Sequence, residues 1–321
     1  MNYRRLGKTG LKVSELSYGS WVTFSFQLKL DDATNMMKLA YDQGINFFDN
    51  AEAYASGRSE MIMGDAIKNL GWSRDSFVIS SKVFWGGDRP TQRGLSHKHI
   101  IDACNNALKR LNLDYLDLYF CHRPDPETPI EETVRAMHTL VMQGKICYWG
   151  TSEWSCGEIE EAYSVARKLN LTPPSMEQPE YNMFEREKME KDYLPLFENE
   201  GLGTTIWSPL SSGLLTGKYI DGMPSGTRTS LESYKFIKDR FESEDYKNKH
   251  EQVKQLHDLA KEIGIPLVQM ALCWCLKNKN VSTVILGASQ PEQLKQNIDS
   301  IDHLDLLDDG IMERIESILK K

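Results

Sequence analysis

Short apolar runs alternate with amphipathic helical patterns along the whole of this chain. Eight of the runs are apolar enough to form strands that are buried on both faces, and apolar residues recur at helical spacing between them. Strands of this kind, separated by helices, pair in parallel under a cover of helices. The eight runs are LSYGSW, INFFD, SFVISSKVF, YLDLYFCH, ICYWGTS, SMEQPEY, TTIWSPL and STVILGAS.

Eight strand–helix units in 321 residues fit one closed (β/α)8 barrel better than an open doubly wound sheet. The sequence therefore predicts an α/β fold with a single barrel domain over residues 1–321. The turn GKTG between YRRL and LKVS predicts a β-hairpin before the barrel, which could close its bottom. The irregular stretch 211–248 predicts a long functional or disordered loop, at the face where the strands end.

Capping sequences mark several helix starts. A Ser or Thr followed three residues later by Glu can form a reciprocal capping box, in which each side chain bonds a backbone N–H of the other. Such boxes are expected for Thr128 with Glu131, Ser155 with Glu158, and Ser289 with Glu292.

Composition excludes several classes of function. The net charge of -8, without a basic block, argues against a nucleic-acid surface. No apolar run approaches the ~18 residues of a membrane span, and no signal peptide precedes the hairpin, so a cytoplasmic location without membrane insertion is expected. The six cysteines lack C-x-x-C spacing and are expected to be small buried hydrophobes, and no metal site is predicted.

Polar side chains gather where consecutive strands end. Asp49 ends the second strand and Tyr54 follows it, Lys82 lies at the end of the third, and His122 ends the fourth. The carboxyl ends of barrel strands form one mouth, where active sites of such barrels lie. A carboxylate, a phenol, an ammonium and an imidazole are therefore expected to converge there.

Each of these residues has a structural alternative. Lys82 could extend to solvent, His122 could sit at a helix entry, and Tyr54 could be a rim aromatic. A buried lysine must be paired, however, and Asp49 on the neighbouring strand can pair Lys82. An ammonium held there would lower the pKa of Tyr54 from ~10 and make the phenol a usable general acid. Glu52 receives no role and is expected to be solvated.

Several ordered motifs along the chain resemble one known family. These motifs are NFFDNAEAY, SSKVFWGG, YFCHRPDPETPIEETVRAM, YWGTSEWS, WSPLSSGLLTGKY and LGASQPEQL. Together they make the chain similar to the aldo-keto reductase superfamily, and most like the branch of voltage-gated potassium channel β-subunits and their microbial relatives. The resemblance runs from RRLGKTGLKVS to the C-terminal helix.

The resemblance implies a catalytic tetrad of Asp49, Tyr54, Lys82 and His122. It implies an NADP-dependent oxidoreductase acting on CH–OH donors, which reduces aldehydes or ketones by hydride transfer from NADPH. Tyr54 would donate the proton, and His122 would orient the substrate oxygen. Trp21 and Trp85 would join His122 in a pocket for an apolar or aromatic aldehyde, although either tryptophan could equally be structural.

The cofactor site must differ from a Rossmann site, because no G-x-G-x-x-G follows any strand. The start of the helix after strand eight, capped by Ser289, offers free N–H groups to a phosphate. By resemblance, Lys218 and Arg228 favour NADPH over NADH, although both could be ordinary surface cations. The implied cofactor contacts are Ser20, Trp21, Gln27, Asp49, Ser152, Gln178, Trp207, Ser208, Pro209, Leu210, Ser211, Ser212, Lys218, Arg228, Gly287, Ser289, Gln293 and Asn297.

Two functions remain open from the sequence. One is an autonomous reductase of small carbonyl substrates. The other is a redox-sensing β-subunit that regulates a voltage-gated potassium channel. His122, where the channel branch carries Asn, favours the enzyme, as does the lack of an N-terminal extension that could plug a pore. The branch also forms tetramers or larger rings, so a homo-oligomer is expected by resemblance.

Overall fold

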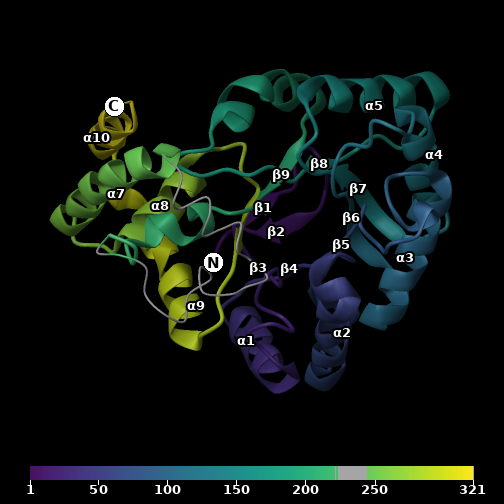
Figure 1. Cartoon of the computed structure of the whole chain (residues 1–321), viewed down its shortest axis with the longest axis horizontal. Helices are drawn as coiled ribbons and strands as arrows, with labels where there is room; N and C mark the ends of the chain where they lie inside the picture. Colours follow the sequence, from purple (N-terminus) through teal and green to yellow (C-terminus); the bar gives the residue numbers. More distant parts are fainter. Residues whose placement is uncertain (221, 223–243, 321) are drawn as a thin grey trace. The chain divides into compact units, whose positions relative to one another are not determined.

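A computed structural model describes residues 1–220, 222 and 244–320 of the chain (Figure 1). These residues divide into two compact units. Unit 1 comprises Met1–Pro179, Glu187–Trp207 and Asn280–Leu294, and unit 2 comprises Glu180–Arg186, Ser208–Lys279 and Lys295–Lys321. The single domain expected over 1–321 stays a prediction.

Unit 1 contains the predicted barrel. Eight strands close on themselves in the order β10-β3-β4-β5-β6-β7-β8-β9, and every neighbouring pair is parallel. Each strand falls inside one of the apolar runs of the sequence or begins one residue before it, so the (β/α)8 fold is confirmed. The strands are β3 Leu16–Gly19, β4 Phe47–Asp49, β5 Val78–Val83, β6 Leu116–Cys121, β7 Ile146–Thr151, β8 Met176–Glu177, β9 Gly203–Ile206 and β10 Thr283–Leu286.

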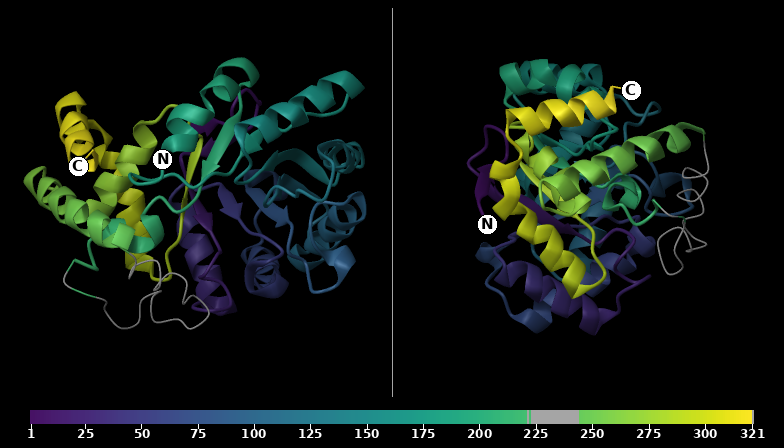
Figure 2. Two further views of the ribbon diagram at one scale, coloured as in Figure 1. Left: turned by 45° about the horizontal axis from the view of Figure 1, so that its top comes forward. Right: turned by 90° about the vertical axis from the view of Figure 1, so that its left-hand side faces the viewer.

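Helices of unit 1 cover the outside of these strands (Figure 2). Each helix buries one apolar stripe; in the helix after β5 the stripe includes Ile100, Cys104 and Leu111, as its spacing predicts. Two π-helical turns, Lys188–Asp192 and Leu196–Glu200, take the place of a regular helix after β8. The five regular helices are α1 Leu30–Asp42, α2 Arg58–Leu70, α3 His97–Leu111, α4 Ile130–Met142 and α5 Cys156–Leu169.

The expected capping boxes have different outcomes. Ser155 and Glu158 form theirs at the start of α5, which confirms that prediction. The box at α4 is wrong, because the N-cap of the helix is Pro129 and not Thr128, and no side chain caps the helix. The Thr128 hydroxyl instead donates to Asp125 Oδ2 at 2.7 Å. The helix after β10, α9, spans Pro291–Ile298, and the box expected for it stays a prediction.

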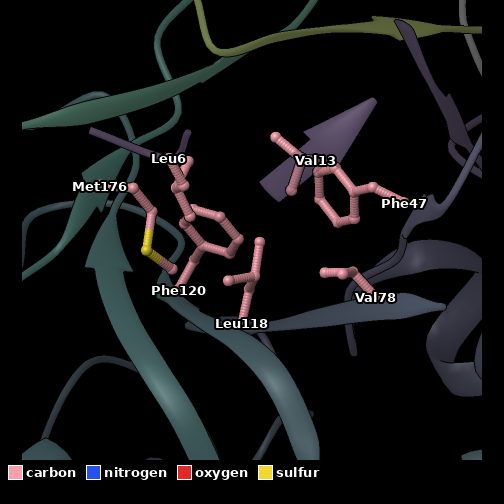
Figure 3. Close-up of a cluster of buried hydrophobic side chains, with 7 residues drawn as sticks. All are labelled: Leu6, Val13, Phe47, Val78, Leu118, Phe120 and Met176. Carbon is pink, nitrogen blue, oxygen red and sulfur yellow. The ribbon is translucent and has the colours of Figure 1, made fainter. Parts of the chain in front are cut away.

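The N-terminal hairpin closes one end of the barrel core. Strands β1 (Tyr3–Arg5) and β2 (Lys12–Ser14) pair antiparallel, as predicted. Leu6 and Val13 of the hairpin are fully buried in a cluster with side chains of four barrel strands, and three of these side chains are the first residues of β4, β5 and β8 (Figure 3). The buried cluster consists of Leu6, Val13, Phe47, Val78, Leu118, Phe120 and Met176. The hairpin therefore completes the core at the end opposite the strand ends where the polar residues gather.

Unit 2 is helical. It contains α7 (Glu244–Glu262), α8 (Leu267–Lys277) and α10 (Asp309–Leu319). Its described residues also form the 3-10 stretches Ser211–Thr216 and Asp299–Leu306. The α8 helix is buried from Leu267 through Leu276. In the described parts of the chain no single helix is long and apolar enough to span a membrane, and only residues 248–262 with 267–277, bent by 93°, pass that test as a pair.

The cysteines differ in part from expectation. Cys104, Cys121, Cys273 and Cys275 are buried, but Cys147 is exposed on β7. Along β7 the burial changes from one residue to the next, so an apolar run in the sequence does not make every position internal.

The hairpin contact generates a stability prediction. Leu6→Ala should lower the free energy of unfolding by ~2–5 kcal/mol, because it leaves a cavity in a fully buried cluster. Leu194→Ala, the same chemical change at a side chain that is 41% exposed, should change it by less than ~0.5 kcal/mol. Urea denaturation of both variants measures the difference. Equal losses would show that the hairpin does not complete the core.

Candidate active site

The four expected catalytic side chains come from adjacent elements of unit 1. Asp49 ends β4, Lys82 lies near the end of β5, and His122 directly follows β6. These strands are hydrogen-bonded in that order. Tyr54 opens the 3-10 turn that follows β4. The structure thus brings together the side chains that the sequence predicted to converge.

Lys82 lies at the centre of this group and is fully buried. Its Nζ donates to Asp49 Oδ2 at 2.7 Å, to the Asn50 carbonyl oxygen at 2.8 Å and to Tyr54 Oη at 3.1 Å. An ammonium has three hydrogens, so all of its donors are used. Burial lowers the pKa of Lys82 below its ordinary value, and the charge of Asp49 opposes that shift.

Asp49 is held from three sides. Its Oδ1 accepts hydrogen bonds from Ser80 Oγ at 2.8 Å and from Gln178 Nε2 at 3.1 Å. Its backbone oxygen accepts from the N–H and the hydroxyl of Ser20, at 3.1 and 2.9 Å. Because every oxygen is bonded, the carboxylate is satisfied in its charged form and can balance the buried ammonium.

The turn that carries Tyr54 has an unusual backbone. Ala55 and Ser56 adopt left-handed conformations, with φ of 50° and 54°. Residues other than glycine adopt this region at a cost, and such strain concentrates at functional sites. The turn places the Tyr54 oxygen against Lys82, and a bond donated by an ammonium favours the phenolate over the phenol.

His122 is buried and neutral. Burial lowers the pKa of its imidazole well below the ordinary value, and the charges of Lys82 and Arg123 lower it further. The Nδ1 atom is buried and makes no hydrogen bond within the described part of the chain. The imidazole ring is 5.8 Å from that of Tyr54, measured between centroids. A neutral imidazole beside the phenol can hold an oxygen without adding a charge.

Aromatic rings flank the two candidate proton-bearing groups. The ring centroid of Trp21 lies 6.4 Å from that of Tyr54 and 6.0 Å from that of Trp207. Trp85 packs edge-on against His122 at 5.1 Å and is 37% exposed. Both tryptophans expected in a substrate pocket thus lie beside the tetrad.

Glu52 corrects the sequence interpretation, because it is buried and not solvated. Its Oε1 accepts the Phe84 N–H at 2.8 Å and lies 3.6 Å from His99 Nε2. Burial raises the pKa of this carboxyl to about 7. The side chain therefore ties the turn that carries Tyr54 to the segment that carries Trp85.

A second buried acid lies behind the tetrad. Glu60 accepts hydrogen bonds from Ser81 Oγ at 2.7 Å and from Arg110 Nε at 2.6 Å. Burial raises the pKa of Glu60, and Arg110 opposes the shift. This pair joins α2, α3 and β5 beneath the site.

The expected cofactor contacts of unit 1 lie at its strand ends. Gln178 Nε2 is bonded to Asp49 and to Thr205 Oγ1, while its Oε1 accepts no hydrogen bond in the described residues. Ser152 Oγ donates to the Gln178 carbonyl at 2.8 Å. At the end of β10 the Ser289 N–H donates weakly to Gln293 Oε1 at 3.4 Å, so this helix start is loosely satisfied.

The remaining unit 1 residues that are expected to contact the cofactor make few side-chain hydrogen bonds within the described part of the chain. Gln27 is half-buried and Gly287 is exposed. Trp207 Nε1 donates to Glu153 Oε1 at 3.0 Å. That these residues contact the cofactor stays a prediction.

The other expected cofactor contacts belong to unit 2 or lie outside the described residues. In the run Ser208, Pro209, Leu210, Ser211 and Ser212, the three serines have positive φ, and Ser208 Oγ accepts the Ser212 N–H at 3.1 Å. Lys218 is exposed and Asn297 is buried. Arg228 lies outside the described residues. The roles of all these residues remain predictions.

Two residues of the site were not predicted from the sequence, although their positions next to predicted site residues could have indicated them. Ser80 precedes Lys82 by two residues, and alternate residues of a strand face the same side, so it bonds Asp49 as Lys82 does. Arg123 directly follows His122 and donates to the His122 carbonyl at 2.5 Å and to Ser152 Oγ at 3.3 Å.

Comparisons with known proteins identify the family of the chain. A sequence model of the aldo/keto reductase family matches residues 15–320. A "Probable voltage-gated potassium channel subunit beta" of Arabidopsis thaliana is 50% identical, and one of Oryza sativa subsp. japonica is 49% identical. Each alignment spans 321 residues, which is 100% of this chain and 97% of the relative. The resemblance found in the motifs is confirmed.

The buried ion pair generates a prediction about stability. Asp49→Asn should lower the free energy of unfolding by ~3–5 kcal/mol, because it leaves the Lys82 ammonium buried without a counter-charge. Adding Lys82→Met should recover most of the loss. Asp42→Asn, at the exposed pair with Lys38, should cost no more than ~1 kcal/mol. Chemical denaturation at neutral pH measures all three, and a loss at Asp49 no larger than at Asp42 would contradict the pairing.

The raised pKa of Glu52 generates a prediction about pH. The folded state keeps the Glu52 proton up to about pH 7, whereas the unfolded state releases it near 4.5. Protonation therefore stabilises the fold at low pH, and this contribution is lost as the pH rises through 7. The free energy of unfolding of the parent is compared with that of Glu52→Gln at each pH. The difference, parent minus variant, should fall by up to ~3 kcal/mol between about pH 4 and pH 8.

The matched control for this experiment is Glu131→Gln. Glu131 is an exposed carboxyl on α4 that pairs with Arg135. The difference in the free energy of unfolding between the parent and Glu131→Gln should stay nearly constant over the same pH range. If the free energies of unfolding of the parent and of Glu52→Gln depend on pH in the same way, Glu52 is solvated and the prediction is wrong.

Proposed function

Because the chain belongs to the aldo/keto reductase family, we propose that it reduces aldehydes or ketones to alcohols with NADPH, with Tyr54 as the proton donor. Family membership makes the protein an oxidoreductase. The observation that carries the finer proposal is the contact of the buried Lys82 ammonium with both Asp49 and the Tyr54 oxygen. A phenol whose oxygen accepts from an ammonium gives up its proton more readily.

The residues of unit 1 fit a nicotinamide. The Gln178 amide nitrogen is engaged, so its free Oε1 can accept from the carboxamide NH2 of the cofactor, next to Ser152. Bound NADPH would supply the hydride. Trp21, half-buried beside Tyr54, can pack against a flat ring at the same place and keep water away from it.

The four residues of the tetrad have different roles at the substrate oxygen. His122, neutral because of burial and its cationic neighbours, can donate one N–H to the carbonyl oxygen and orient it toward Tyr54. Tyr54 then gives its proton to that oxygen as negative charge develops there. Lys82 holds the phenolate that remains, and Asp49 keeps Lys82 in place.

The preference for NADPH over NADH rests on the family resemblance and on the cations Lys218 and Arg228 in an acidic chain. A tetramer or larger ring is proposed from the family resemblance alone, and a cytoplasmic location stays a prediction. Titration with both cofactors measures the preference. NADH bound as tightly as NADPH would remove that part of the proposal.

A second function is suggested by the two relatives, each of which is named as a probable voltage-gated potassium channel subunit beta. In that case the same site would sense the redox state of NADP while the protein is bound to a channel. The neutral His122 beside Tyr54 favours the enzyme. Co-purification with a channel, together with no turnover of any carbonyl compound, would favour the regulatory role.

The assignment of the proton donor is testable by one substitution. Tyr54→Phe should lower kcat by ~10²–10⁴-fold, because it removes the general acid, and should leave NADPH binding intact. Tyr148→Phe, a phenol on β7 outside the tetrad, should retain activity. Loss of NADPH absorbance with a panel of aldehydes measures turnover, and cofactor fluorescence measures binding. A Tyr54→Phe variant that is as active as the parent would refute the assignment.

A further inference from the structure

Arg123 is a half-buried cation at the edge of the tetrad. It follows His122 at the end of β6, and its Nη1 donates to the His122 carbonyl at 2.5 Å and to Ser152 Oγ at 3.3 Å. Its guanidinium carbon lies 5.5 Å from the ring centroid of Trp85. Trp85 in turn packs on His122. The guanidinium is therefore fixed beside the ring that lines the expected substrate pocket.

The charge of Arg123 has no carboxylate to balance it. No ion pair joins Arg123 to an acidic side chain in the described residues, whereas Lys82 is paired with Asp49 and Arg110 with Glu60. The positive charge acts on the site, because it lowers the pKa of both Lys82 and His122. A cation without a counter-ion, next to the already paired Lys82, creates a local positive potential at the mouth of the barrel.

The donors of Arg123 are only partly used. Both of its hydrogen bonds come from Nη1, and Nε and Nη2 make none within the described ranges. A guanidinium presents a planar fork that matches a carboxylate, and an aromatic face beside it restricts the fork to one orientation. The unused side of the fork can therefore take two oxygen atoms of an anion that enters beside Trp85.

We propose that Arg123 binds a carboxylate of the substrate, so that the preferred substrates are aldehydes or ketones that also carry a carboxylate group. The carbonyl end would lie at Tyr54 and His122, and the carboxylate end would lie at Arg123 beside Trp85. The carboxylate takes no part in the chemistry and serves only to hold the substrate. This inference rests on the proposed reductase function and names its substrate class.

The test compares each acid with its own methyl ester. Initial rates of NADPH oxidation are measured with 3- and 4-formylbenzoate and with their methyl esters, for the parent, Arg123→Gln, Arg123→Lys and Arg135→Gln. The acid-to-ester ratio of kcat/KM should fall by about tenfold or more in Arg123→Gln for at least one isomer, mainly through KM. Arg123→Lys should retain part of the preference, because it keeps the charge without the fork.

Arg135 on α4 is the matched control, because it is an exposed arginine that pairs with Glu131. Its substitution should leave the acid-to-ester ratio unchanged. A structural role of Arg123 would lower the rates with acid and ester alike and leave the ratio of the parent intact. An unchanged ratio in Arg123→Gln would therefore overturn the inference, while the turnover itself would still support the proposed reductase.

If no compound is turned over, a binding measurement tests the carboxylate site at Arg123 separately from the reductase function. Calorimetry with 4-(hydroxymethyl)benzoate and its methyl ester, in the presence of NADPH, reports affinity without reaction, because both the alcohol and the cofactor are already reduced. Tighter binding of the acid by the parent, lost in Arg123→Gln, would uphold the carboxylate site even though the reductase function had failed. Equal affinities for acid and ester in the parent would overturn the site.

Discussion

A lysine ammonium buried completely inside the barrel is the feature on which the rest of this structure depends. Removing such a charge from water costs several kcal/mol, and the cost is offset only when a counter-charge and further acceptors surround it. Lys82 meets that condition with one carboxylate, one carbonyl oxygen and one phenol oxygen. The strand register that brings β4 beside β5 is thus also the register that makes the buried charge tolerable.

Asp49 extends this constraint around the barrel. Its side-chain and backbone oxygens are bonded by Ser80, Gln178 and Ser20, which lie on or just after β5, β8 and β3. The same bonds that satisfy the carboxylate therefore fix the strand ends where a cofactor and substrate would bind. Behind them, Glu52 and Glu60 attach the surrounding turns and helices to β5 through buried contacts. Stability and reactivity have a common origin here, because the group that needs the most support is also the group that contacts the proposed proton donor.

The barrel and the convergence of the four polar side chains could be predicted from the sequence because both depend on local patterns. Apolar runs reveal strands that are buried on both faces, and Asp49, Lys82 and His122 stand where those runs end. Glu52 could not be placed, because an acid in a polar turn looks solvated until the packing of Phe84 and His99 over it is known. The capping box at Thr128 failed because the N-cap lies one residue later, at Pro129, so the Thr128 side chain is not at the capping position. Interactions between distant elements, such as Glu60 with Arg110, leave no local signal at all.

The central claim is that the buried pair of Lys82 and Asp49 acts on chemistry through Tyr54. A mutant cycle of kcat/KM values for carbonyl reduction tests this claim most directly. It compares the parent with the exchange variant Lys82→Met/Asp49→Asn, with the single variant Tyr54→Phe, and with the triple variant that carries all three substitutions. The exchange removes both buried charges at once, so neither is left unpaired. If the pair acts through Tyr54, the triple variant should be no slower than Tyr54→Phe alone. Losses that multiply would contradict the account, because they would mean that the ion pair and the phenol act independently.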